Sequence, residues 1–134
     1  MTPRIEKSEQ EWRSELTPAR YDVLRRKGTE PPFSGGYVHT KEDGVYRCAG
    51  CGTDLFSSDT KFDSGTGWPS FTDPAASANI ELHEDRSLFT RRTEVTCATC
   101  GGHLGHVFDD GPGPSGQRYC INSASLDLDR GVEA

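Results

Sequence analysis

Two matched Cys-x-x-Cys-Gly turns constrain the fold of this chain more than any other feature of its sequence. Cys48 and Cys51 form the first pair and Cys97 and Cys100 the second, and glycine follows each pair at once. Glycine there permits the positive φ that a tight metal-binding turn often requires. Four thiolates complete a tetrahedral Zn²⁺ site with no open position, which is a structural arrangement. The alternatives are redox-active dithiols or two disulfides; we predict one structural zinc ion per chain.

Residues 52–96 separate the two pairs, so a shared ion would clamp two distant segments of one domain. The chain has 134 residues, the size of a typical single domain, but only 32% of them are hydrophobic and 15 are glycine. A bound metal ion adds folding stability to a domain with so small a hydrophobic core and so many turns. We predict one domain over residues 1–134, with a helical N-terminal segment at about 8–28 and a β core at about 36–128.

Charge and apolar content exclude several classes of partner. The formal net charge of −6 argues against a nonspecific nucleic-acid binder, which needs a basic surface. No apolar run reaches transmembrane length, and the first residues do not resemble a signal peptide. Zinc-bound thiolates suit a reducing compartment, so we expect the protein to be cytoplasmic. We also expect a monomer that binds neither nucleic acid nor membrane.

Two short helices are predicted at the start of the chain. Ser8 can cap the first helix, with Glu11 as its capping-box partner. Thr17 and Pro18 have the N-cap and N1 identities of a second helix, which should stop at Gly28.

Short β-type runs alternate with turn clusters from residue 37 onward. The runs are Tyr37–His39, Gly44–Arg47, Asp54–Phe56, Ser87–Thr90, Glu94–Thr96, His106–Phe108 and Tyr119–Asn122. This spacing predicts a mainly β fold in which two antiparallel sheets form a sandwich or open barrel. The acidic tail from Asp127 is expected to fray.

The fifth cysteine, Cys120, lies outside both pairs and is the candidate for a reactive thiol. If residues 118–122 form a strand, Arg118, Cys120 and Asn122 share one face. A guanidinium beside a thiol favours the thiolate and lowers its pKa, and Asn122 adds an amide donor. The alternative is a buried structural cysteine beside a solvated arginine, which is the commoner role of a free cysteine.

Two histidines, His103 and His106, precede this segment, and a four-thiolate site needs neither as a ligand. Histidine is the commonest general acid or base near neutral pH. On a strand that begins near His106, Phe108 and Asp110 share its face, and Asp110 could orient a partner or pair with Arg118. The alternative places both histidines at the surface or close to the second cysteine pair.

A tryptophan, Trp68, lies in the glycine-rich run of residues 64–71 and precedes a proline. A rigid loop of this kind can present a large aromatic face, which suits an apolar or methyl-sulfur group. The alternative is that Trp68 caps the core.

Three segments resemble the signature blocks of the type B methionine sulfoxide reductases: Gly67–Phe71, Gly101–Gly111 and Arg118–Ser123. The two Cys-x-x-Cys pairs occur at the matching places, and the resemblance covers roughly residues 8–128. It implies two antiparallel sheets with N-terminal helices. It also implies reduction of the R epimer of methionine sulfoxide, free or within proteins, to methionine.

The resemblance also implies a reactive group. Cys120 would attack the sulfoxide sulfur and become a sulfenic acid. His103 and His106 match the groups that protonate or polarise the sulfoxide oxygen, and Asn122 would help to hold that oxygen or the thiolate.

The same resemblance implies supporting roles and one departure. Arg118 and Asp110 would tune and orient the site, Trp68 would bind the S-methyl group and select the epimer, and Phe108 would form a second wall. Many members carry a resolving cysteine where this chain has Thr66. The other four cysteines belong to the metal pairs, so we expect no internal disulfide. An external small thiol or a thioredoxin-type protein would then reduce the sulfenic acid.

Two other classes of function stay open. A zinc-ribbon interaction module would bind a protein partner through Trp68 and the acidic surface, and it would not need Cys120. A thiol peroxidase or redox sensor would need a reactive Cys120 but no methyl-binding aromatic side chain. Comparing how fast methionine sulfoxide and peroxide oxidise Cys120 discriminates between the reductase and the peroxidase.

Overall fold

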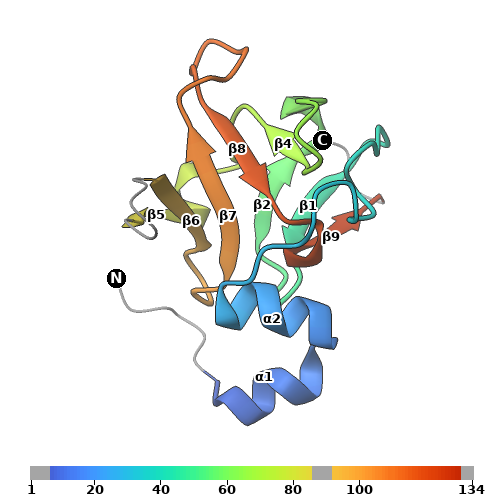
Figure 1. The fold of residues 1–134 in the computed structure, drawn as a ribbon, viewed down its shortest axis with the longest axis vertical. Coiled ribbons are helices and arrows are strands. Elements are labelled where there is room, and N and C mark those ends of the chain that lie inside the picture. Colours follow the sequence, from blue (N-terminus) through green and yellow to red (C-terminus); the bar gives the residue numbers. More distant parts are fainter. Residues whose placement is uncertain (1–6, 86–91, 131–134) are drawn as a thin grey trace.

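A computed structural model describes residues 7–85 and 92–130 (Figure 1). The first element of the described residues is helix α1 (Glu9–Glu15), whose N-terminus has the predicted capping box. The Ser8 hydroxyl accepts a hydrogen bond from the Glu11 N–H, and the Glu11 carboxylate accepts one from the Ser8 N–H. Two of the N–H groups at this helix end are therefore bonded by side chains close in the sequence.

Helix α2 (Pro18–Arg26) follows after a two-residue break, and Thr17 caps it as predicted. Its C-cap residue, Lys27, adopts a left-handed conformation with φ of 57°. The Gly28 N–H then bonds to the carbonyl of Asp22, which ends the helix at the predicted glycine. Figure 1 shows both helices lying beyond one end of the sheets.

The strands of the described residues form two antiparallel sheets, which confirms the predicted fold class. The strands are β1 (Val45–Cys48), β2 (Asp54–Ser57), β3 (Lys61–Phe62), β4 (Ser70–Phe71), β5 (Ile80–Asp85), β6 (Arg92–Cys97), β7 (His103–Phe108), β8 (Arg118–Ile121) and β9 (Leu126–Asp129). The smaller sheet has the order β2-β1-β9, and the larger has the order β3-β4-β8-β7-β6-β5. Short 3-10 turns connect them at η1 (Ser58–Thr60), η2 (Ser77–Asn79) and η4 (Ser123–Ser125).

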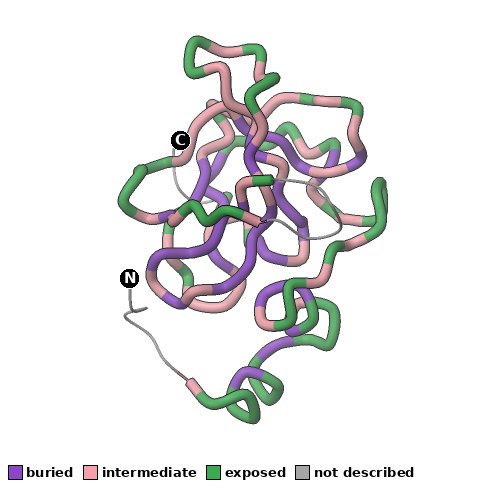
Figure 2. Tube along the Cα trace, turned by 60° about the vertical axis from the view of Figure 1, so that its left-hand side comes forward, coloured by how far each residue is buried: buried purple, intermediate pink, exposed green. Residues whose placement is uncertain are grey.

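The core lies between the two sheets and is rich in aromatic rings. Phe56 on β2 stacks on Phe71 on β4 with ring centroids 4.5 Å apart, and Tyr46 on β1 meets the edge of Phe71 at 5.2 Å. Such pairs contribute roughly 0.5–1.5 kcal/mol each beyond their buried area. Figure 2 shows the buried positions concentrated along the strands, whereas α1 is mostly exposed apart from Trp12. Three aromatic side chains therefore hold the two sheets together.

One predicted strand, Tyr37–His39, is wrong, because this segment consists of turns and bends. Its polar groups bond to side chains rather than to a strand ladder. The Tyr37 N–H donates to the Ser123 hydroxyl, and the Val38 carbonyl accepts from Lys61 Nζ. The side chains of this segment pack individually against other elements and form no strand pair. The Tyr37 ring, for example, meets the ring of Tyr46 on β1 edge-on.

The acidic tail is also more ordered than expected. Residues from Asp127 do not fray at once, since β9 pairs with β1 as far as Asp129. The guanidinium of Arg47 on β1 contacts the Asp129 carboxylate at 2.8 Å, which offsets the charge on the tail. The predicted strand Ser87–Thr90 lies outside the described residues. No helix of the described part of the chain is long and apolar enough to cross a membrane.

Candidate functional site

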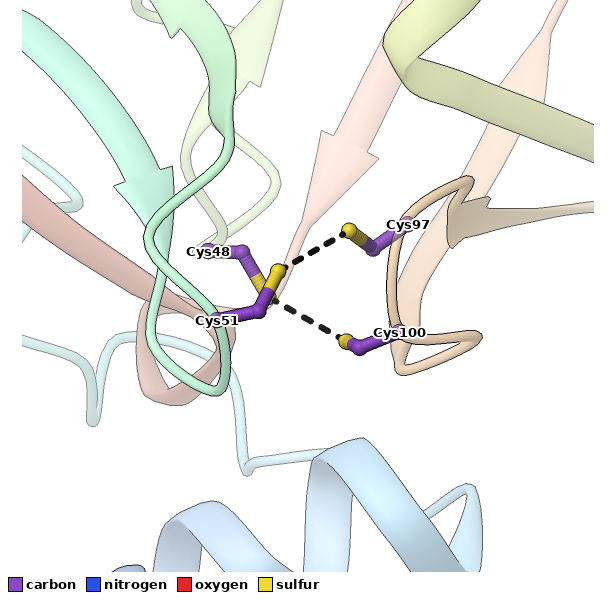
Figure 3. Close-up of side chains that lie close together, drawn as sticks. All are labelled: Cys48, Cys51, Cys97 and Cys100. Carbon is purple, nitrogen blue, oxygen red and sulfur yellow. Dashed lines mark hydrogen bonds between the residues drawn. The ribbon is translucent and has the colours of Figure 1, made fainter. Parts of the chain in front are cut away.

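The four paired cysteines meet at one point between two turns (Figure 3). Cys48 ends β1 and Cys51 lies in the turn that follows, whereas Cys97 ends β6 and Cys100 lies in the turn between β6 and β7. Two sulfur–sulfur contacts join the two pairs, at 3.7 Å for Cys48–Cys100 and 3.6 Å for Cys51–Cys97. These four cysteines could therefore hold one metal ion.

The sulfur geometry fits a tetrahedral ion. All four sulfur atoms lie within 4.8 Å of one another. A tetrahedron with metal–sulfur bonds of about 2.3 Å has sulfur–sulfur edges of about 3.8 Å, whereas a disulfide bond is about 2.0 Å long. Backbone and side-chain donors also approach the sulfurs, for example the Gly50 N–H at 3.4 Å from Cys48 Sγ. The Arg25 guanidinium bonds to the Cys100 carbonyl and ties the second turn to α2.

The second candidate site is a cavity of about 220 Å³ over the strand pair β7–β8. In this pair His106 lies directly opposite Cys120, and Phe108 lies opposite Arg118. The predicted site residues that line the cavity are Trp68, His106, Phe108, Arg118, Cys120 and Asn122, and they are joined by Thr29, Thr66, Arg92 and Gly105. Arg118, Cys120 and Asn122 thus share one face, as the alternation of a strand predicts.

A bulge brings the second histidine close to the first. Val95 on β6 pairs with Gly105, but the next residue, Thr96, pairs with His103, so Leu104 is an extra residue in β7. Without this bulge, His103 and His106, which are three residues apart, would point to opposite faces of the strand. With it, their rings meet edge-on with centroids 5.5 Å apart. His103 is buried and is not among the cavity-lining residues, so it lies behind His106 rather than on the wall.

Each histidine is paired with a carboxylate that sequence reasoning missed. His103 Nδ1 lies 2.7 Å from a Glu94 oxygen, and His106 Nε2 lies 3.0 Å from an Asp85 oxygen. Burial lowers the pKa of His103, and the bond to Glu94 acts in the opposite direction. Glu94 belongs to a predicted strand, and a charged residue inside a buried strand was the available signal for such a partner.

The Cys120 thiol experiences two opposing effects. Burial raises its pKa above the ordinary value, whereas the Arg118 guanidinium and the Thr66 hydroxyl act to lower it. Arg118 therefore acts in the predicted direction, but burial outweighs it. The expectation of a thiol with a lowered pKa is accordingly wrong in its net sign. The Cys120 sulfur is thus partly shielded from water in the cavity and has the Arg118 guanidinium as a neighbour.

Arg118 is fixed on both sides. Its Nε and Nη2 atoms form a paired contact with the Asp110 carboxylate at 2.8 and 3.2 Å, and its guanidinium lies 4.5 Å from the centre of the Phe108 ring. Asp110 lies beyond the end of β7, and its pKa is lowered chiefly by the bond from Arg118. Of the two roles expected for Asp110, the structure shows the pairing with Arg118.

Trp68 and Asn122 are held by backbone groups. The Trp68 indole N–H donates to the Glu30 carbonyl at 2.9 Å. The Asn122 side chain donates to the Leu104 carbonyl at 3.0 Å and accepts from the Glu30 N–H at 3.0 Å. Asn122 therefore uses one of its two amide hydrogens within the protein. Glu30, to which no sequence pattern assigned a role, contacts both residues.

Comparison with known proteins gives concordant matches. Residues 16–130 match the SelR domain family model. The chain is 65% identical over 123 residues to the peptide methionine sulfoxide reductase MsrB of Methanosarcina mazei, covering 92% of this chain and 88% of that protein. It is 60% identical over 126 residues to the MsrB of Bradyrhizobium diazoefficiens, covering 94% and 91%. It is also 57% identical over 119 residues to the mitochondrial methionine-R-sulfoxide reductase B3 of Mus musculus, covering 89% of this chain and 47% of that protein.

Proposed function

Because this chain belongs to the MsrB family, whose SelR domain it contains, we infer that it is a peptide-methionine (R)-S-oxide reductase. It reduces the R epimer of methionine sulfoxide to methionine. One observation carries the inference beyond the family match: Cys120 lies in a cavity with the His106 imidazole opposite it and the Trp68 indole on another wall. A nucleophile, a proton donor and a methyl-binding surface thus face the same space.

Cys120 is proposed as the nucleophile. Its thiolate attacks the sulfoxide sulfur, and the sulfoxide oxygen is protonated as its bond to that sulfur breaks. The S–S bond formed by the attack then breaks with its electron pair going to the substrate sulfur, the oxygen bonds to Cys120 Sγ to give a sulfenic acid, and methionine leaves. The substrate sulfur gains two electrons, and the cysteine sulfur loses two. Arg118 supports this step by stabilising the thiolate against the cost of burial.

The two histidines are proposed as the source of the protons. His106 lines the cavity and lies opposite Cys120, so it is placed to polarise or protonate the sulfoxide oxygen. His103 supports it from behind, with its Nδ1 atom held by Glu94. The free amide hydrogen of Asn122 is a further donor for the oxygen or the thiolate.

Substrate selection is assigned to the aromatic walls. Trp68 would bind the S-methyl group, which suits the face of an indole ring, and Phe108 would form the second wall. The two epimers exchange the positions of the oxygen and the methyl group about the sulfur. A methyl-binding wall on one side and proton donors on the other therefore accept one epimer only.

The metal is proposed to be Zn²⁺, held by the four paired cysteines. Thiolates are preferred zinc ligands, and a site with four of them has no open position for substrate. A bound ion would supply structural stability by tying the end of β1 to the turn between β6 and β7. The residues Cys48, Cys51, Cys97 and Cys100 would then take no part in the redox step.

The oxidised enzyme is proposed to be restored by an external reductant, either a small thiol or a thioredoxin-type protein. Thr66 lines the cavity beside Cys120 in place of a resolving cysteine, and the other four cysteines lie in the metal cluster. We also propose that the enzyme is a single-domain monomer acting in the cytoplasm on free or protein-bound substrate. A Cys120–cysteine disulfide found by mass spectrometry after turnover, with zinc retained, would contradict the direct route.

The test of the proposed activity uses the purified protein, dithiothreitol and separated R and S epimers of an N-blocked methionine sulfoxide. We expect methionine release from the R epimer only, and none from the Cys120→Ser variant. Turnover of peroxide but not of either sulfoxide would favour a thiol peroxidase. No turnover at all, with zinc bound and the fold intact, would favour a zinc-containing interaction module.

A further inference from the structure

Glu30 links two cavity residues that come from distant parts of the chain. It lies in the segment between α2 and β1, outside both sheets. Its backbone carbonyl accepts a hydrogen bond from Trp68 Nε1 at 2.9 Å, and its backbone N–H donates to Asn122 Oδ1 at 3.0 Å. One peptide segment therefore contacts the wall proposed to bind the methyl group and a donor proposed to bind the oxygen.

The bond from Glu30 also determines how the Asn122 amide is turned. A backbone N–H can only donate, so the amide oxygen must face Glu30. The NH₂ group then points the other way, where one hydrogen bonds to the Leu104 carbonyl at 3.0 Å. The second hydrogen has no acceptor among the described residues and is left for a group in the cavity. If the Glu30 backbone moved away, the amide could turn over and present its oxygen to the cavity instead.

The Glu30 side chain anchors this backbone segment. Its Oε1 atom accepts a hydrogen bond from the Ala124 N–H at 2.9 Å, in the η4 turn just after Asn122. Its Oε2 atom is buried and has no hydrogen-bond partner among the described residues. A side chain at Gly35 would collide with both this oxygen and the Ser123 hydroxyl, so the carboxylate is closely confined. A half-satisfied, confined carboxylate is costly and calls for a functional explanation.

We propose that Glu30 is a positioning residue for the reductase reaction: its carboxylate locks residue 30 onto η4, and the locked backbone holds Trp68 and Asn122 in register with Cys120. The proposal rests on the function inferred above. The segment between α2 and β1, which contains Glu30, then contributes to the selection of the R epimer. The buried carboxylate also has a role that depends on the reach of its oxygen and not on its charge.

Two conservative variants separate reach from charge. Glu30→Gln keeps an oxygen at the position that accepts from Ala124 but removes the charge. Glu30→Asp keeps the charge but withdraws the oxygen by one methylene. A third variant, Tyr37→Phe, is the matched control, because it removes another bond from the same segment, that from the Leu128 N–H, without touching Trp68 or Asn122.

We expect kcat/KM for the R epimer to fall about tenfold or more in Glu30→Asp, since a displacement of about 1 Å can cost about 100-fold. The preference for the R over the S epimer should fall with it. Glu30→Gln and Tyr37→Phe should stay within about twofold of the wild type. The opposite order of the two Glu30 variants would show that charge matters instead, and would overturn the proposal. So would wild-type activity and selectivity in all three.

Hydrogen exchange of the Trp68 indole N–H, followed by NMR, measures positioning without turnover. We expect faster exchange in Glu30→Asp than in the wild type or Glu30→Gln, with the zinc content unchanged. Unchanged exchange in Glu30→Asp would contradict the proposal even if activity fell. If the wild type itself did not reduce the R epimer, the inferred function would fail, while the exchange measurement would still decide whether Glu30 holds Trp68.

Discussion

The two thiol sites of this molecule place the same side chain in opposite surroundings. In the cluster, each sulfur faces other sulfurs, and the four atoms lie within 4.8 Å of one another. Cys120 has a guanidinium, a hydroxyl and an open cavity as its neighbours. Four thiolates at such distances repel one another unless a cation lies between them, whereas a single thiolate beside Arg118 is stabilised and stays accessible.

This contrast shows that the neighbours of a cysteine, and not its own chemistry, divide structure from catalysis here. The cluster is built on two tight turns that bring distant segments together, so its loss should affect the fold. Cys120 is built on a strand that is already paired on both sides, by β4 and β7, so its loss should affect only the reaction.

The largest expected effect is on turnover in Cys120→Ser. A serine hydroxyl is a far weaker nucleophile than a thiolate at neutral pH, so we expect methionine release to fall by more than about 1,000-fold. The free energy of unfolding and the zinc content should stay near those of the wild type, because the substitution is nearly isosteric. Thermal unfolding and metal analysis provide the check. A large loss of stability would place Cys120 among the structural cysteines.

The second prediction concerns the four-cysteine cluster, where the main loss should be in stability and not in the chemical step. Removal of one cluster ligand, in Cys97→Ser, should release the metal and destabilise the protein by several kcal/mol, which lowers Tm by more than about 10 °C. A zinc-specific chelator should have the same effect on the wild type. Calorimetry with and without the chelator measures it. An unchanged Tm after complete metal loss would show that the turns do not need the ion.

The third prediction concerns the pH dependence of the reaction. Burial holds the Cys120 pKa above its ordinary value and Arg118 lowers it, so kcat/KM should rise with pH as the thiolate forms. In Arg118→Gln the pKa should rise further, and the curve should move to higher pH. We expect a loss of about tenfold at neutral pH, the typical effect of one neighbouring charge, which narrows in alkaline solution. Arg118→Lys, which keeps the charge, is the control and should lose less.

The two helices, the four-cysteine cluster and the strand face that carries Cys120 could all be predicted from short sequence patterns. Capping residues placed both helices, and the paired Cys-x-x-Cys-Gly turns predicted the cluster of four cysteines. Strand alternation placed Arg118, Cys120 and Asn122 on one face. The helix caps, the strand alternation and each Cys-x-x-Cys-Gly turn are patterns of residues close together in the chain. The joining of the two turns, which are far apart in sequence, follows from the four ligands that one zinc ion needs.

Other parts of the site depend on contacts between distant segments. The extra residue Leu104, which turns His103 toward His106, is defined only by how β7 pairs with β6. The carboxylates of Asp85 and Glu94 become partners of the histidines through the order β5-β6-β7. The segment Tyr37–His39 has the composition of a strand, but tertiary contacts override that preference.

The smallest expected effect tests how far the surroundings of Cys120 extend. The Asp110 side chain is 68% exposed, whereas that of Arg118 is 14% exposed and also packs on the Phe108 ring. In Asp110→Asn the guanidinium should therefore stay near Cys120, and we expect a change in kcat/KM of no more than about threefold.

The direction of the pH shift in Asp110→Asn is the sharper result. The Asp110 charge acts to raise the Cys120 pKa, so its removal should lower that pKa and move the curve to lower pH, opposite to Arg118→Gln. A pH–rate profile of the two variants side by side measures both signs. If both curves moved to higher pH, Asp110 would act by holding Arg118 in place, and the site of Cys120 would include the exposed carboxylate as a necessary support.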